Sequence, residues 1–230
     1  MMLPAEKHLE ILSRHLELKD STILDVGAGG GEVSSKLRGQ GARVVGLECS
    51  RNQMNRAVEH QREGCCFVYG VCEDLPLRQN SFDATVFLNS MHHIPESFMD
   101  KAILEVTQVT KPGGMIYIAE PLAEGPCFEL DSSVEDETEV REKAQQALNQ
   151  SQENQSNWRE TQQEYYQVYF DYNEFEEYKD EMLRFDSSRK SHFERIEDKM
   201  KKKFLKLSEK TPQGFRFYQP MLARCFLVSV

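Results

Sequence analysis

Short apolar segments alternate with segments of helical periodicity as far as residue 120, and this alternation constrains the fold more than any other feature of the chain. The apolar segments are rich in Val, Ile and Phe, and we predict strands at residues 21–26, 43–47, 66–71, 82–88 and 115–119. Continuous apolar strands separated by helices are typical of a parallel sheet that is covered by helices on both faces. We therefore predict an α/β fold with a doubly wound, mostly parallel sheet.

The composition changes after Pro121. Acidic, then Gln- and Asn-rich, then basic segments follow one another, and helical periodicity persists only in patches. We predict an α/β core over residues 1–122 and a mainly helical insertion over 123–213. The apolar segment 214–230 is expected to return to the core sheet as one or two terminal strands.

Charge and cysteine content narrow the function classes. With 28 basic against 38 acidic residues the net charge is −10, which argues against a nucleic acid as partner. No segment approaches the roughly 18 apolar residues of a membrane span, and the first ten residues lack the pattern of a secretory signal. The six cysteines form no CxxC pair, so we expect reduced thiols in a cytoplasmic protein that has no membrane partner.

A glycine-rich loop follows the first predicted strand, in the sequence ILDVGAGGG at residues 23–31. Gly27, Gly29 and Gly31 let the backbone turn sharply and approach a ligand. The spacing does not match the G-x-G-x-x-G of dinucleotide sites, and no G-K-[ST] motif follows. Asp25 lies beside the loop, where its carboxylate would repel a pyrophosphate and attract an ammonium or a sulfonium.

Glu48 ends the second predicted strand, 17 residues after Gly31. An acid at this place can accept hydrogen bonds from two ribose hydroxyls. A carboxylate at a strand end can also be solvated or cap the next helix. The neighbouring glycine loop favours the binding interpretation.

Four segments together resemble the class I S-adenosylmethionine-dependent methyltransferases, particularly the branch related to quinone-biosynthesis C-methyltransferases. The segments are LDVGAGGGEVSSKL (24–37), VVGLECS (44–50), EDLPLRQNSFDATVFLNSMHHI (73–94) and KPGGMIYIAEP (111–121). The resemblance covers about residues 20–122 and the last strand. It implies a Rossmann-like, seven-stranded sheet and a methyltransferase that uses S-adenosyl-L-methionine as its cofactor.

The resemblance also implies a role for individual residues. The glycine loop would contact the methionine part of the cofactor, Glu48 the ribose, residues around Cys72 and Glu73 the adenine, and Asn89 would lie near the methyl donor. The implied cofactor-binding residues are Asp25, Gly27, Ala28, Gly29, Glu48, Cys49, Cys72, Glu73 and Asn89. Where the family often has G-D-A before the adenine segment, this chain has GVC at 70–72. The missing acid predicts a lower affinity for the cofactor.

His92 and His93 follow the fourth predicted strand. An imidazole near neutral pKa can take a proton from a substrate hydroxyl or amine, which makes His93 the candidate catalytic residue. The alternative is that both histidines belong to the loop scaffold, because H-H-I recurs in family members of many chemistries. Two adjacent histidines without further partners are poor metal ligands, so we expect no metal.

The aromatic segment 165–172 has two interpretations. It can line a substrate pocket, or it can be the packed face of a helix in the insertion. An insertion at this place lies beside the carboxyl ends of the strands, where open α/β sheets bind ligands, so we expect a substrate lid.

We therefore expect methyl transfer to a small-molecule acceptor. The sulfonium already activates the methyl group, so the absence of an obvious nucleophile or catalytic triad is compatible with this reaction. Two alternatives are a catalytically inactive regulatory module that binds S-adenosylmethionine and, less favoured, a nicotinamide-dependent oxidoreductase. The acceptor, the methylated atom and the oligomeric state do not follow from the sequence.

Overall fold

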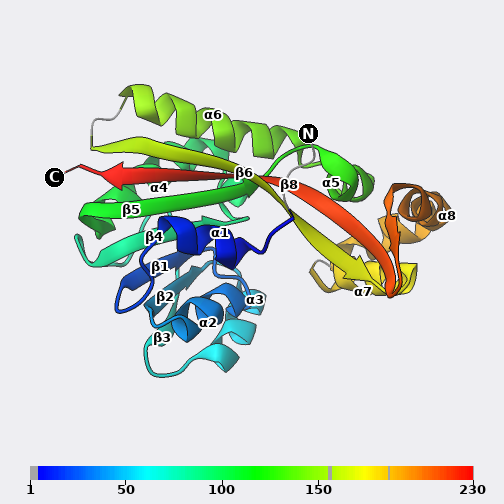
Figure 1. Ribbon diagram of the computed structural model, residues 1–230, viewed down its shortest axis with the longest axis horizontal. Helices are drawn as coiled ribbons and strands as arrows, with labels where there is room; N and C mark the ends of the chain where they lie inside the picture. Colours follow the sequence, from blue (N-terminus) through cyan, green and yellow to red (C-terminus); the bar gives the residue numbers. More distant parts are fainter. Residues whose placement is uncertain (1–4, 155–156, 186, 230) are drawn as a thin grey trace. The chain divides into compact units, whose positions relative to one another are not determined.

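The computed structural model describes residues 5–154, 157–185 and 187–229. Residues 1–4, 155–156, 186 and 230 belong to the ranges predicted for the core, the insertion and the last strand, and they lie outside the described residues. The strands are β1 (Thr22–Val26), β2 (Arg43–Glu48), β3 (Cys65–Tyr69), β4 (Phe82–Leu88), β5 (Thr110–Pro121), β6 (Trp158–Tyr172), β7 (Glu209–Thr211) and β8 (Gly214–Val228). They form one sheet in the order β3-β2-β1-β4-β5-β8-β6, and β7 pairs with β8 (Figure 1).

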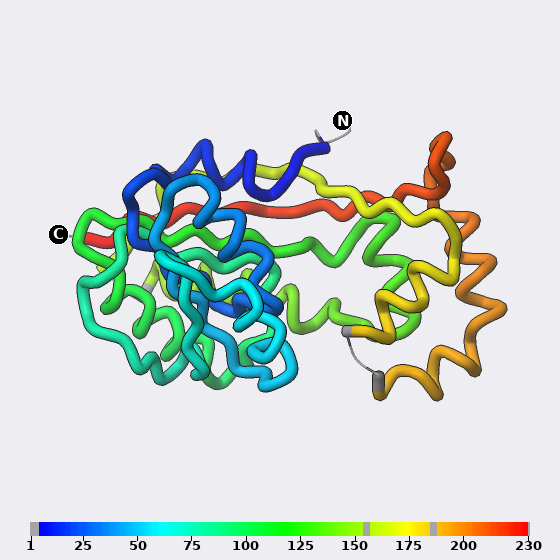
Figure 2. The backbone as a smooth tube through the Cα atoms, turned by 90° about the horizontal axis from the view of Figure 1, so that it is seen from below, coloured from blue at the N-terminus to red at the C-terminus, as the bar shows by residue number. Residues whose placement is uncertain are grey.

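The first five strands are parallel, as the sequence predicts. Helices α2 (Glu32–Gly39) and α3 (Arg51–Ala57) lead from β1 outward to β3, whereas α4 (Glu96–Val109) leads from β4 outward to β5. Right-handed crossovers in opposite directions put these helices on opposite faces of the sheet. Figure 2 shows α1 (His8–His15) and α4 on opposite sides of the strands. The doubly wound, Rossmann-like fold is thereby confirmed.

The strand count corrects one detail of the prediction. The sheet has eight strands rather than seven, because the insertion contributes β6 and the hairpin partner β7. The aromatic segment 165–172 lies on β6, so its interpretation as a helix is wrong. The rest of the insertion is mainly helical and consists of α5 (Gly125–Asp131), α6 (Thr138–Asn154), α7 (Phe175–Phe185), α8 (Lys190–Leu207) and a short turn, η3 (Ser187–Arg189).

Contacts divide the chain into two compact units, each with its own hydrophobic core. One comprises residues Lys7–Glu120, Val140–Glu164 and Leu222–Val230. Its core joins the sheet to α4 and α6, and Trp158 stacks on Phe226 with 4.2 Å between the ring centroids. The other comprises Met1–Glu6, Pro121–Glu139 and Tyr165–Met221, and aromatic side chains of β6, α7, α8 and β8 fill its core.

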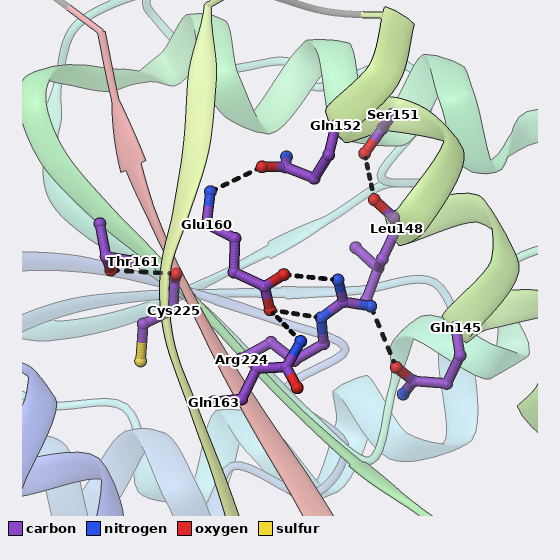
Figure 3. Close-up of polar contacts among 9 residues, drawn as sticks. All are labelled: Gln145, Leu148, Ser151, Gln152, Glu160, Thr161, Gln163, Arg224 and Cys225. Carbon is purple, nitrogen blue, oxygen red and sulfur yellow. Dashed lines mark hydrogen bonds and ion pairs between the residues drawn. The ribbon is translucent and has the colours of Figure 1, made fainter.

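A buried polar network fastens α6 to the last strands of the first unit (Figure 3). The guanidinium of Arg224 is 3% exposed and donates from Nε and Nη2 to the two carboxylate oxygens of Glu160, at 2.7 and 2.9 Å. A third donor, Nη1, reaches Oε1 of Gln145 on α6 at 3.3 Å. The backbone N–H of Glu160 donates to Gln152, also on α6. The bidentate pair joins β6 to β8, and the hydrogen bonds to Gln145 and Gln152 connect it to α6.

Among the described residues, no helix is both long and apolar enough to cross a membrane. All six cysteines lie within the described residues, and none of them forms a disulfide.

Candidate functional site

The glycine loop begins where β1 ends. The N–H groups of Gly27 and Ala28 both donate to the carbonyl of Leu47 at 2.9 Å, which ties the loop to β2. Gly27 has φ +72°, and a Cβ there would lie 2.5 Å from the Cβ of Ser90. Gly29 has φ +56°, but a Cβ there would meet nothing within 4 Å. The loop therefore packs against a neighbouring loop at Gly27 and leaves open space at Gly29.

Glu48 lies directly against this loop. Its Oε2 accepts the N–H of Gly29 at 2.8 Å, and its Oε1 accepts the N–H of Ser50 at 2.6 Å. A carboxylate has about four acceptor positions, so two remain after these hydrogen bonds. The structure thus brings together the two features on which the sequence argument depends.

Asp25 lies within the protein rather than at its surface. The side chain is buried, and its Oδ2 accepts the hydroxyl proton of Ser34 on α2 at 2.6 Å. Burial raises the pKa of Asp25 to about 6; the hydrogen bond from Ser34 opposes this shift, and the charge of Glu48 adds to it. The Asp25 carboxylate is therefore hydrogen-bonded to Ser34. Its expected attraction for a ligand cation would act at a distance, through its charge.

Ala28, Cys49 and Glu73 are the other predicted residues around Glu48. Ala28 is buried and faces Gly46 of β2, where an added Cβ would lie 2.9 Å from the Ala28 Cβ. Cys49 is exposed, and its thiol pKa is raised by partial burial and then by the charge of Glu48, with a smaller contribution from Glu73. The carboxylates of Glu48 and Glu73 thus both lie close to Cys49.

Cys72 is a further predicted cofactor-binding residue. Its side chain is 6% exposed and belongs to the core beside α4, with Sγ 3.9 Å from the carbonyl of Ala102. Burial raises the pKa of this thiol, so it stays protonated. Only the backbone of Cys72 is left to face a ligand, because the small apolar side chain fills the core. The preceding Val71 is 41% exposed.

The loop after β4 carries Asn89 and the two histidines. Asn89 is exposed, adopts the left-handed conformation with φ +54°, and donates its N–H to the carbonyl of Ala119 at 3.0 Å. His93 is also exposed. His92 is buried, and its Nδ1 is hydrogen-bonded to Glu120. The two imidazoles therefore differ in environment, and His92 belongs to the scaffold of the loop.

Sequence reasoning missed Glu120. This residue is the next to last of β5, has no exposed surface and accepts hydrogen bonds from the backbone N–H groups of Ser90, Met91 and His92. Burial raises its pKa, but the hydrogen bond and charge of His92 and the two nearest N–H groups outweigh burial and leave the pKa lowered. The only sequence signal was an acid that directly follows the apolar run MIYIA.

The exposed members of this set share one edge of the sheet. Gly27 follows β1, Cys49 follows β2, and Asn89 and His93 follow β4. Open parallel sheets bind ligands outside the carboxyl ends of their strands.

Comparison with known proteins gives a family match for the segment that contains the glycine loop and Glu48. Residues 24–118 match a family model described as a methyltransferase domain. The matched segment makes up less than half of the chain. The resemblance stated from the sequence is thereby confirmed.

Curated relatives of named function align with part of the chain. A ubiquinone biosynthesis O-methyltransferase of Chromobacterium violaceum is 25% identical over 118 residues, which are 48% of this chain and 49% of the relative. A demethylmenaquinone methyltransferase of Renibacterium salmoninarum is 35% identical over 98 residues, which are 43% and 40% of the two chains. The chain thus spans about half the length of the curated relatives that it matches.

Solved structures extend the likeness beyond residues 24–118. A Bacillus halodurans protein named as a candidate methyltransferase superposes with a TM-score of 0.64 at 17% identity, covering 96% of this chain and 98% of that one. The YcgJ protein of Bacillus subtilis gives a TM-score of 0.60 at 18% identity, covering 96% and 97%. At these identities the likeness establishes the fold alone.

Proposed function

We propose that this protein is an S-adenosylmethionine-dependent methyltransferase that acts on a small-molecule acceptor. The observation that carries the proposal is the contact between Glu48 and Gly29 at the carboxyl edge of the sheet, within a segment that matches the methyltransferase domain family. A nucleoside ligand needs both features, an acid for its ribose and a backbone turn that it can approach closely.

The residues present fit this cofactor. A Cβ at Gly29 would stand in open space beside Glu48, so the loop leaves room for a ligand on that side. Glu48 keeps two acceptor positions for the 2′- and 3′-hydroxyls of a ribose. The carboxylate of Glu73 and the backbone around Cys72 are the candidates for contacts to the adenine. Asp25 would add negative potential from beneath the loop.

When bound, S-adenosylmethionine would supply a methyl group that its sulfonium has already activated. The chain then has to orient the acceptor and exclude water. Asn89 and His93 are exposed on the loop after β4 and are the candidates for contact with the acceptor. His93 would take the proton from an acceptor hydroxyl or amine, and His92 would keep the loop in place through Glu120.

A small acceptor is favoured over a polyanion. The net charge of −10 disfavours nucleic acid. The two named relatives belong, by their names, to quinone metabolism, but they align with this chain over about half their length. We therefore propose the small-molecule class and leave the methylated atom open.

A specific observation favours a second candidate, a regulatory module that binds the cofactor without catalysis. Val71 is exposed where the family often has an acid for the adenine amino group. The fold alone does not decide the reaction, because a structure named as the [4+2]-cyclase SpnF superposes with a TM-score of 0.59 at 19% identity, covering 96% of this chain and 80% of that one.

Two measurements test the proposal. Differential scanning fluorimetry should show stabilisation by S-adenosylhomocysteine and none by NADH; the reverse result would support an oxidoreductase. Incubation with S-adenosylmethionine and a mixture of metabolites should then release S-adenosylhomocysteine. Binding without any release across a broad set of phenols, quinols and amines would support the regulatory module.

A further inference from the structure

The carboxylate of Glu120, near the candidate site, has two hydrogen bonds at each of its oxygens. Its Oε1 accepts the N–H groups of Ser90 and Met91 at 3.0 and 2.9 Å. Its Oε2 accepts the N–H of His92 at 3.3 Å and is also hydrogen-bonded to the Nδ1 of the same residue. Four donors from three consecutive residues thus converge on one carboxylate that solvent does not reach.

These donors belong to the loop that meets the glycine turn. The hydroxyl of Ser90 donates to the carbonyl of Val26 at 2.6 Å, and its Cβ occupies the place that a side chain at Gly27 would need. On the other side, the N–H of Asn89 donates to the carbonyl of Ala119. A continuous chain of contacts therefore runs from Glu120 at the end of β5, through the loop after β4, to the turn after β1.

The arrangement requires a carboxylate. An amide at this position would keep one acceptor oxygen for Ser90 and Met91. Its NH₂ group would face the N–H of His92, which is also a donor. Since the carboxylate accepts from Nδ1 of His92, this nitrogen carries a proton, which fixes the orientation of the imidazole. Replacing the buried carboxylate with an amide would therefore leave the N–H of His92 without an acceptor, which is costly inside the protein.

We propose that Glu120 is a positioning residue that holds the loop bearing Asn89 and His93 in register with the glycine turn. Ligand affinity at Gly29 and the orientation of groups at the end of β4 would then depend on the same buried side chain. The ligand part of this proposal rests on the proposed function, whereas the effect on the loop does not.

The test compares Glu120→Gln and Glu120→Ala with Thr85→Val. Thr85 lies on β4 and is buried, and its hydroxyl is 2.7 Å from that of Thr110, so Thr85→Val removes a buried hydrogen bond without touching the loop. Three quantities are measured on each folded variant: the amide hydrogen exchange of residues 89–93, the affinity for S-adenosylhomocysteine by calorimetry, and the imidazole ¹⁵N shifts of His92.

We expect Glu120→Gln to speed exchange at Ser90 and Met91 at least tenfold and to weaken S-adenosylhomocysteine binding at least tenfold. Its His92 shifts should report loss of the proton from Nδ1, which a general loss of stability would not cause. Glu120→Ala should show larger changes in exchange and affinity. Thr85→Val should leave the exchange rates and the affinity within about twofold of the wild type and the His92 shifts unchanged.

Unchanged exchange and unchanged His92 shifts in Glu120→Gln would overturn the proposal, as would equal effects of Thr85→Val. If the wild-type protein does not bind S-adenosylhomocysteine, the proposed function fails. Exchange and ¹⁵N shifts then decide by themselves whether Glu120 positions the loop.

Discussion

The hydroxyl of Ser34 donates to Oδ2 of Asp25 over 2.6 Å, and both side chains are buried below the glycine loop. Burial, opposed by this hydrogen bond, raises the pKa of Asp25 from 3.8 to about 6. Between these two values the folded protein holds a proton that the unfolded chain releases. The contribution of Asp25 to stability is therefore largest at low pH and is lost as the pH rises from about 4 to about 6.

Asp25→Asn should remove the loss of stability that the wild type shows as the pH rises. The amide oxygen can still accept from Ser34 and never has to ionise in a buried place. We expect the variant to gain stability relative to the wild type as the pH rises from 4 to 7, by on the order of 1–3 kcal/mol. Urea unfolding at pH 4.5, 6 and 7.5 measures the difference. A constant difference across the three pH values would contradict the assignment.

His8 on α1 acts in the opposite direction. Burial, with a smaller contribution from the charge of Lys36, lowers the pKa of His8 from 6.5 to about 4. The unfolded chain then binds the extra proton, so stability falls as the pH drops from about 6.5 to about 4. Relative to His8→Gln, the wild type should lose on the order of 1–2 kcal/mol across this window. The same urea series tests this, and a wild-type curve parallel to that of the variant would refute it.

The sequence predicts the parallel half of the fold well because each strand from β1 to β5 is short, apolar and bounded by turn residues. It also predicts that Glu48 meets the glycine loop, since consecutive parallel strands end at the same edge. It misleads at β6, where the polar and aromatic residues WRETQQEYYQVYFDY carry no clean alternation and the strand has an uneven burial pattern.

The surroundings of Cys72 and Glu120 depend on residues that are distant in the sequence. The motif predicts that backbone groups around Cys72 contact the adenine, and contacts with α4, about 30 residues later, decide that its side chain fills the core. Glu120 was missed because the N–H groups that donate to it lie about 30 residues earlier in the chain. The local sequence pattern shows neither the contact of Cys72 with α4 nor that of Glu120 with the loop after β4. These residues come together only when the sheet and its helices pack.

Glu48→Ala should weaken binding of S-adenosylmethionine by about 1–3 kcal/mol, as expected for the loss of charge-assisted hydrogen bonds. Part of the loss comes through Gly29, whose N–H loses its acceptor. Calorimetry measures the affinity, with Glu59→Ala, an exposed acid of the short turn η1 (Val58–His60), as the matched control. Unchanged affinity in Glu48→Ala would remove Glu48 from the site.

Glu160→Gln should destabilise the pairing of β6 with β8. The substitution removes the countercharge of Arg224, whose guanidinium stays buried. Breaking one side of a buried pair costs about 3–5 kcal/mol, whereas replacing both partners with apolar residues costs much less. Urea unfolding of Glu160→Gln and of Arg224→Met/Glu160→Leu compares the two cases. Equal losses in the single and double variants would show that the charge pair itself stabilises the protein.

Gly29→Ala should separate binding from stability. The residue has φ +56°, so a methyl group adds backbone strain of about 1–2 kcal/mol, but it meets no atom within 4 Å. Gly113 offers a matched control, because it has φ +77° and equally open surroundings at a position remote from the glycine loop. Both alanine variants should therefore unfold at similarly reduced urea concentrations. Only Gly29→Ala should lose affinity for S-adenosylhomocysteine, at least tenfold, since its methyl group stands in the space beside Glu48 that the ligand would fill. Equal affinity in the two variants would mean that this space is not part of the binding site.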